Sequence, residues 1–149
     1  MEVKKILCAV DLEDTIAPSV EYAKMMASMT GASILVAYVI PAHTPYEDVY
    51  LSVNNQPNEV NNPNETIQKS MNALLAEQFA GMDVTGVILV GRPSEELVKL
   101  AEEKGANLIV MGTHGRAGFD RLLFGSVAHE VVRAAPCPVM TVRPLMPKK

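Results

Sequence analysis

The chain has 149 residues, of which 48% are hydrophobic and 20% are charged, with no tryptophan. This length and composition are typical of one soluble globular domain and exclude a disordered or fibrous chain. The net charge of −4 supplies no overall positive field, so we expect no binding to nucleic acid or to an anionic membrane surface. The sequence contains no apolar run near the ~20 residues of a membrane helix and no export signal, which predicts a cytoplasmic protein.

Apolar strand-like runs alternate with helical patterns along the chain. Strands are expected at Val3–Val10, Ser33–Ile40, Val84–Val90, Asn107–Met111 and Pro138–Arg143. Helices are expected between Thr15, a candidate cap, and Gly31, along Ile67–Phe79, at Ser94–Lys104 and at Ser126–Ala135. This alternating order predicts an α/β fold, a single domain over residues 1–149 with one open, parallel, five-stranded sheet and helices on both faces.

One segment interrupts this order. The stretch from Pro41 to Asn64 holds six asparagines and four prolines and is longer than an ordinary connection. It is predicted to be a loop insertion at about residues 41–64. It is either a surface loop or a lid or interface loop with Tyr46, Tyr50 and Leu51 as contacts, and the sequence leaves both interpretations open.

Neither cysteine belongs to a metal-binding pattern. Cys8 lies in an apolar run, Cys137 lies between two prolines, and no histidine has ligand spacing to either of them. We therefore expect two reduced thiols and no metal site made from a cluster of side chains.

Two glycine-containing segments flank the loop between the fourth strand and the fourth helix. They are Gly112-Thr113-His114-Gly115 and Gly125-Ser126. Glycine lets the backbone approach a ligand closely, and a capped helix start offers free N–H groups to an anion, so this region suits a phosphate. His114, Arg116 and Arg121 would add positive charge at its edge. The alternative is an ordinary glycine turn in which Ser126 only caps the helix.

Asp11 ends the first strand and is the second candidate. In open parallel sheets, ligands bind at the carboxyl ends of the strands where the strand order reverses. In a sheet of order 3-2-1-4-5 this reversal would bring Asp11 and Gly112 to the same edge. The carboxylate there would accept a hydrogen bond from a ribose hydroxyl or hold a hydrated Mg²⁺ ion, and the alternative is that it caps the following turn.

Motifs of other nucleotide-binding proteins and of hydrolases are absent. The sequence has no P-loop, no glycines after the first strand as in dinucleotide-binding folds, and no nucleophile elbow. Ser126 and His129 share a helix face, but nothing in the sequence supplies a group to orient His129. We therefore expect no catalytic residue.

Gly112, Gly115, Gly125 and Ser126 together fit the pattern G-x2-G-x9-G-[ST]. With Val10-Asp11, the segment 90–93 and the ending 137–142, the chain resembles the universal stress protein family over nearly its whole length. The resemblance implies a Rossmann-like sheet of order 3-2-1-4-5, as in adenine nucleotide alpha hydrolase-like proteins. Because the glycine pattern is whole, it also implies the ATP-binding type of the family, with Mg²⁺.

The resemblance implies a role for each residue of the site. Asp11 would face the ribose, the backbone of Ala9 and Val39 would border the adenine, and Met111 and Val127 would line the pocket. Some family members have proline where this chain has Ala9, which leaves a backbone contact unaffected. The phosphates would lie against the remaining residues, namely Gly112, Thr113, His114, Gly115, Arg116, Gly125 and Ser126.

These observations predict a cytosolic ATP-binding stress or signalling protein. We expect a homodimer through the strand 138–143, because an edge strand without charge before Arg143 would otherwise aggregate, and the resemblance points the same way. The alternative is a slow ATPase or nucleotidyl-transferring enzyme on the same scaffold. Such relatives carry a Ser-Gly-Gly loop where this chain has Leu12-Glu13-Asp14, which favours binding. A third reading is an interaction module that binds no nucleotide.

Overall fold

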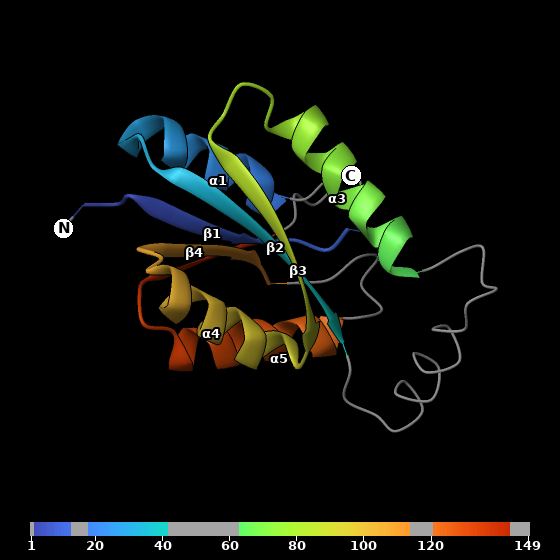
Figure 1. Ribbon diagram of the computed structural model, residues 1–149. Helices are drawn as coiled ribbons and strands as arrows, with labels where there is room; N and C mark the ends of the chain where they lie inside the picture. Colours follow the sequence, from blue (N-terminus) through green and yellow to red (C-terminus); the bar gives the residue numbers. More distant parts are fainter. Residues whose placement is uncertain (1, 13–17, 42–62, 114–120, 144–149) are drawn as a thin grey trace, which may run out of the picture.

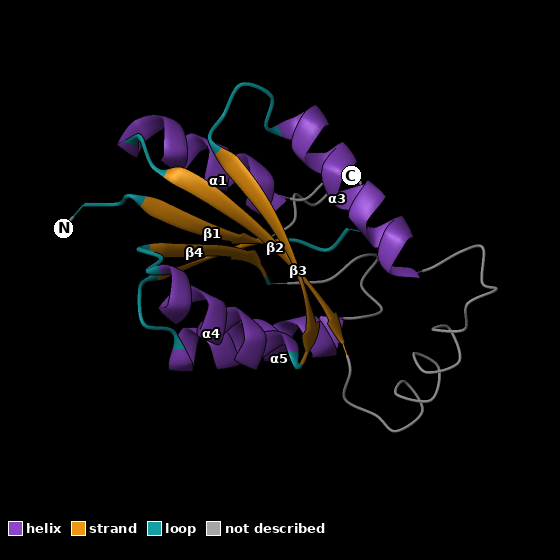
Figure 2. Ribbon diagram, viewed as in Figure 1, coloured by secondary structure: helices purple, strands orange, loops and turns teal. Residues whose placement is uncertain are grey.

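The computed structural model describes residues 2–12, 18–41, 63–113 and 121–143 (Figure 1). Its strands are β1 (Lys5–Ala9), β2 (Ser33–Pro41), β3 (Val84–Gly91), β4 (Leu108–Gly112) and β5 (Val139–Val142). The helices within these ranges are α1 (Pro18–Thr30), α3 (Pro63–Gln78), α4 (Pro93–Lys104) and α5 (Arg121–Ala134). Helices and strands alternate as predicted (Figure 2).

The five strands form one parallel sheet of order β3-β2-β1-β4-β5, which confirms the predicted topology. Helices α1 and α3 cover one face of this sheet, and α4 and α5 cover the other (Figure 1). Crossovers between parallel strands are right-handed, so those that run in opposite directions along a sheet place their helices on opposite faces. The chain places β2 and then β3 on one side of β1, and then crosses to the other side to place β4 and β5. The helices change face at that crossover.

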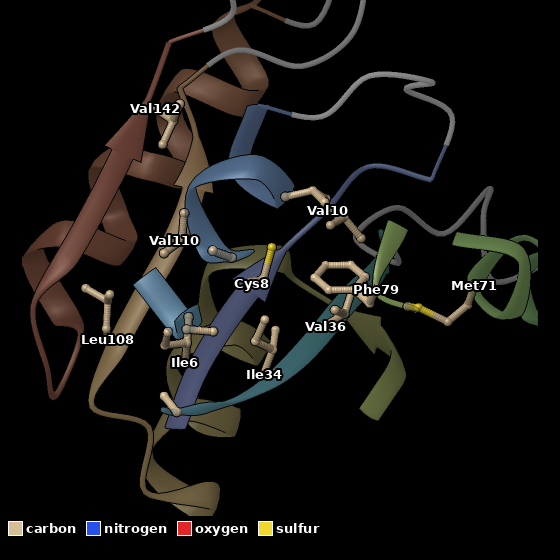
Figure 3. Close-up of a cluster of buried hydrophobic side chains, with 14 residues drawn as sticks. Ile6, Cys8, Val10, Ile34, Val36, Met71, Phe79, Leu108, Val110 and Val142 are labelled. Atoms are coloured by element: carbon tan, nitrogen blue, oxygen red, sulfur yellow. The ribbon is translucent and has the colours of Figure 1, made fainter. Parts of the chain in front are cut away.

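The central strand β1 supplies both hydrophobic cores. Ile6 and Cys8 point into the cluster beneath α1 and α3, which Figure 3 shows, and Leu7 points into the cluster beneath α4 and α5. All three side chains have no exposed surface. Because side chains alternate between the faces of a strand, burial on both faces requires an apolar residue at each position. This requirement explains the continuous apolar runs of the sequence.

Most strand and helix ends lie within two residues of their predicted positions, but the start of α5 is wrong in the sequence prediction. The helix begins at Arg121, five positions before Ser126. Ser126 therefore lies inside the helix and does not cap its start. The intervening residues include leucines, which favour helix, and one glycine in a helix costs only ~1 kcal/mol. The proposed cap of α1, Thr15, lies outside the described residues.

The predicted loop insertion lies largely outside the described residues as well. Its two ends are described: Pro41 is the last residue of β2 and Pro63 is the first residue of α3. Its candidate contacts Tyr46, Tyr50 and Leu51 belong to the part that is not described.

Gly86 in β3 provides a test of how closely α3 packs on the sheet. A Cβ atom at this position would lie 2.8 Å from Cγ of Met71, whose side chain has no exposed surface. Because the buried methionine has little room to move, we expect Gly86→Ala to destabilise the protein by ~1–3 kcal/mol. Urea unfolding measures this change, and Thr85→Ala, on the exposed side of the same strand, should cost under ~1 kcal/mol. Equal costs would contradict the close packing.

Candidate functional site

At the amino-terminal ends of the strands, here called the amino edge, hydrogen bonds on both sides of β1 hold the sheet together. The backbone N–H groups of Lys4 and Lys5 donate to Oδ1 of Asn107 at 2.8 and 2.9 Å, and the Asn107 N–H donates to the Lys5 carbonyl at 2.8 Å. On the other side, the Ser33 N–H donates to the Lys4 carbonyl at 3.0 Å. These bonds hold β1 to both neighbours and leave its backbone little capacity for a ligand.

The carboxyl-terminal ends of the strands, here called the carboxyl edge, are arranged differently. The pairing of β1 with β4 ends at Cys8 and Val110. Beyond it, the Val10 N–H donates to the carbonyl of Ala37 in β2, whereas the Thr113 N–H donates to the carbonyl of Val142 in β5, each at 3.0 Å. The two central strands therefore take partners on opposite sides. This is the reversal point of the sheet, where open parallel sheets bind their ligands.

Four predicted site residues lie in one hydrophobic cluster beside this point, on the face covered by α4 and α5. Ala9, Val39 and Met111 are buried members of the cluster, and Val127 of α5 packs against it half-buried. They come from three adjacent strands and one helix, so the fold brings together residues that are far apart in the sequence. The cluster therefore forms a buried apolar region next to the strand reversal.

The polar candidates lie directly beyond the ends of β1 and β4. Asp11 and Thr113 are each three residues past the paired residues Cys8 and Val110, and both are partly exposed. The Thr113 hydroxyl donates to the Val142 carbonyl at 3.4 Å. Gly112 is the last residue of β4 and is also partly exposed. The sequence prediction that Asp11 and Gly112 share one edge agrees with these positions.

The remaining candidates are divided by the shifted start of α5. Gly125 and Ser126 lie in its second turn, so their N–H groups have helical partners, and the N–H groups without one belong to the first turn, which begins at Arg121. His114, Gly115 and Arg116 lie outside the described residues. The phosphate side of the predicted site thus stays a sequence prediction, whereas its apolar side is described.

Sequence reasoning missed Ser19. Its side chain is buried, and its hydroxyl donates to the Ala9 carbonyl at 3.2 Å, which ties α1 to the end of β1. Burial raises the pKa of the neighbouring Cys8 thiol to about 12, an effect that the Ser19 hydroxyl partly offsets. Both cysteines are free. A serine in the first turn of a helix is a common feature, so no sequence signal singled it out.

A second group that sequence reasoning missed joins α4 to α5. The Glu130 carboxylate of α5 accepts hydrogen bonds from the Ser94 hydroxyl and, at 3.2 Å, from Nη2 of Arg92. The Ser94 bond, with a smaller contribution from the Arg92 charge, lowers the pKa of Glu130 below its usual value. The partners are 36 and 38 positions apart in the sequence, and no spacing rule connects them.

Two structural features are absent from the described part of the chain. No group of three or more histidine, cysteine or acidic residues there could hold a metal ion. No helix in the described ranges has the length and hydropathy that crossing a bilayer requires.

The fold defines an open parallel α/β protein, a class that binds its ligands where the strand order reverses, which here is between β1 and β4. Within that class the chain belongs to the universal stress protein family, whose model matches residues 2–143. Universal stress protein MJ0577 of Methanocaldococcus jannaschii is 29% identical to it over 153 residues, covering 94% of each chain. Universal stress protein MJ0531 of the same organism is 33% identical over 150 residues, covering 98% of this chain and 84% of the relative.

Solved structures give the same result. The structure of MJ0577 has a TM-score of 0.74 at 27% identity and covers 97% of this chain and 99% of its own. A universal stress protein from Archaeoglobus fulgidus in complex with dAMP has a TM-score of 0.60 at 25% identity, covering 95% of this chain and 98% of its own. The family and the fold expected from the resemblance are both confirmed.

The two cysteines test the packing of the sheet. Burial raises the pKa of both thiols, and Cys8 is fully buried whereas Cys137 is partly exposed. At pH 8 we expect a disulfide reagent such as Ellman's reagent to modify Cys137 slowly and Cys8 only after unfolding in urea, because attack requires an accessible thiolate. In Cys137→Ser the folded protein should not react. Rapid reaction of that variant would contradict the burial of β1.

Proposed function

We propose that this protein binds ATP, with Mg²⁺, at the carboxyl edge of the sheet, and that it acts as a nucleotide-dependent stress or signalling protein in the cytoplasm. The observation that carries the proposal is the divergence of β1 and β4, which leaves Asp11, Gly112 and the apolar cluster of Ala9 and Met111 at one edge. The glycine pattern continues the same edge in the sequence. The dAMP complex of the Archaeoglobus relative supports an adenine nucleotide as the ligand class.

Each part of ATP has a matching group in this proposal. The adenine would lie against the apolar cluster, with the backbone near Ala9 and Val39 at its edge. The Asp11 carboxylate would accept a hydrogen bond from a ribose hydroxyl or bind a water molecule of the Mg²⁺ shell. The phosphates would lie along the glycine pattern, close to the first turn of α5, whose backbone N–H groups lack helical partners and provide donors without demanding net positive charge.

The variant Gly125→Val tests the phosphate side. A branched side chain would stand where the phosphates approach the backbone, so we expect a loss of ~2–4 kcal/mol in ATP binding by calorimetry. Folding should persist, since valine is no worse than glycine inside a helix. The matched control is Ala134→Val at the exposed end of the same helix, which should bind like the wild type. Equal affinity in all three proteins would remove Gly125 from the site.

Hydrolysis is proposed to be slow or absent. The sequence offers no general base with a clear role in positioning water near the glycine-containing loop, and His114 is the one histidine there. In a steady-state assay of phosphate release we expect far less than one turnover per second, unchanged by His114→Ala. Turnover above one per second that His114→Ala abolishes would instead place the protein in the enzyme class.

The proposed assembly is a homodimer through β5. This strand is an edge of the sheet, and its residues Val139–Val142 carry no charge. A twofold axis would pair it antiparallel with its copy, a self-complementary interface.

Light scattering at ~10 µM tests this assembly, because an interface of ~1,200–2,000 Å² should survive that dilution. Thr141→Lys would oppose like charges across the axis and should give a monomer. Thr85→Lys, at an exposed position on the opposite edge strand, should remain a dimer. A soluble wild-type monomer would contradict the proposal.

A further inference from the structure

A group of polar side chains joins α4 to α5, although two helices can pack against each other through apolar side chains alone. Its centre is the Glu130 carboxylate, which accepts from Ser94 with one oxygen and from Arg92 with the other. Arg92 also contacts Oε1 of Glu95 at 3.5 Å, so the guanidinium bridges both helices. Ser94 is only 5% exposed, and a buried hydroxyl requires a partner to offset its lost hydration.

This group stands at the start of α4, which lacks a cap of its own. The N-cap residue Arg92 makes no side-chain capping bond, and the Glu130 carboxylate of α5 approaches this end in addition to Glu95 and Glu96 of the helix's own first turn. An acidic group near a helix N-terminus is favoured by the helix dipole. Glu130 therefore fixes where α5 lies against α4. Because its partner Arg92 directly follows Gly91, the last residue of β3, Glu130 also fixes α5 relative to the end of this strand.

The hydrogen bonds of Glu130 to Ser94 and Arg92 form a link between α4 and α5, and this link lies close to the proposed nucleotide site. On α5, Glu130 is four residues after Ser126 and three after Val127, so all three lie within about one helical turn. On the other side, β3 pairs with β2 so that Leu89 lies beside Val39. The link thus connects the side of the site that carries Val127 to the side that carries Val39.

We propose that Glu130 is a positioning residue for nucleotide binding, which holds α5 at the distance from the sheet that the nucleotide requires. This inference rests on the proposed ATP site and adds a residue that does not itself touch the nucleotide. Its hydrogen bonds set the separation between Val127 and Val39, and hence the width available to the adenine. Loss of the bonds would let α5 shift as a rigid helix, and the nucleotide affinity would fall while the fold remains.

The experiment compares variants that lose stability with variants that lose the link. ATP with Mg²⁺ is titrated calorimetrically at 25 °C into the wild type, Glu130→Ala, Glu130→Gln, Glu95→Gln and Gly86→Ala, and thermal melting is recorded for each. We expect Glu130→Ala to raise the Kd at least tenfold. Glu130→Gln keeps one acceptor oxygen for Arg92 and presents an amide NH₂ that can donate to the Ser94 hydroxyl, so we expect it to recover most of the affinity, within about threefold of the wild type.

Two controls separate positioning from stability. Glu95→Gln removes an ion pair within α4 and leaves the link to α5, so its Kd should equal that of the wild type. Gly86→Ala destabilises the opposite face of the sheet, so its melting temperature should fall while its Kd stays within twofold.

The outcomes distinguish this inference from the proposed function. If the wild type binds ATP and Glu130→Ala binds it equally well with a lower melting temperature, the link only stabilises the fold and the inference is overturned. If Gly86→Ala weakens binding as much as Glu130→Ala, affinity follows general stability and the inference is again overturned. If the wild type binds neither ATP nor dAMP, the proposed function itself is wrong and the inference falls with it.

Discussion

The arrangement of the molecule depends on the parallel pairing of β1 with β2 on one side and β4 on the other. Cys8 lies beside Val36 in one ladder and beside Val110 in the other, and its side chain has no exposed surface. Because the strand is covered on both faces, every residue from Ile6 to Ala9 is apolar and buried. This central position forces the chain to build outward in one direction, return, and build outward in the other. The helices consequently change faces at that return.

The same double pairing produces two unlike edges. At the amino end, Asn107 fastens β1 to β4 through both its side chain and its backbone. At the carboxyl end, the pairing of β1 with β4 stops at Cys8 and Val110, whereas β1 still pairs with β2 at Ala9 and β4 still pairs with β5 at Gly112. The two central strands are therefore held together at one end and separate at the other. The proposed nucleotide site follows from this asymmetry.

The fold could be predicted because its signals are local: apolar runs mark β1 and β2, and Gly31 and Gly105 end α1 and α4 with positive φ angles. The family resemblance named Ala9, Val39, Met111 and Val127 for the apolar side of the site, and the fold brings these residues into one cluster. The predicted start of α5 was wrong because Gly125-Ser126 has the composition of a helix start, but the residues before this pair are helical as well. Ser19 and Glu130 were missed because their partners are set by tertiary packing, which spacing along the chain does not encode.

The most direct test of a nucleotide site at the carboxyl edge is a backbone amide spectrum of the ¹⁵N-labelled protein, recorded with and without MgATP. The two edges of the sheet are separate probes within one molecule. We expect chemical shift changes at Asp11, Gly112, Thr113 and Val127, and none at the fastened amino edge, where Lys5, Ser33 and Asn107 report. Shift changes confined to the amino edge, or a spectrum that millimolar MgATP leaves unchanged, would contradict the account.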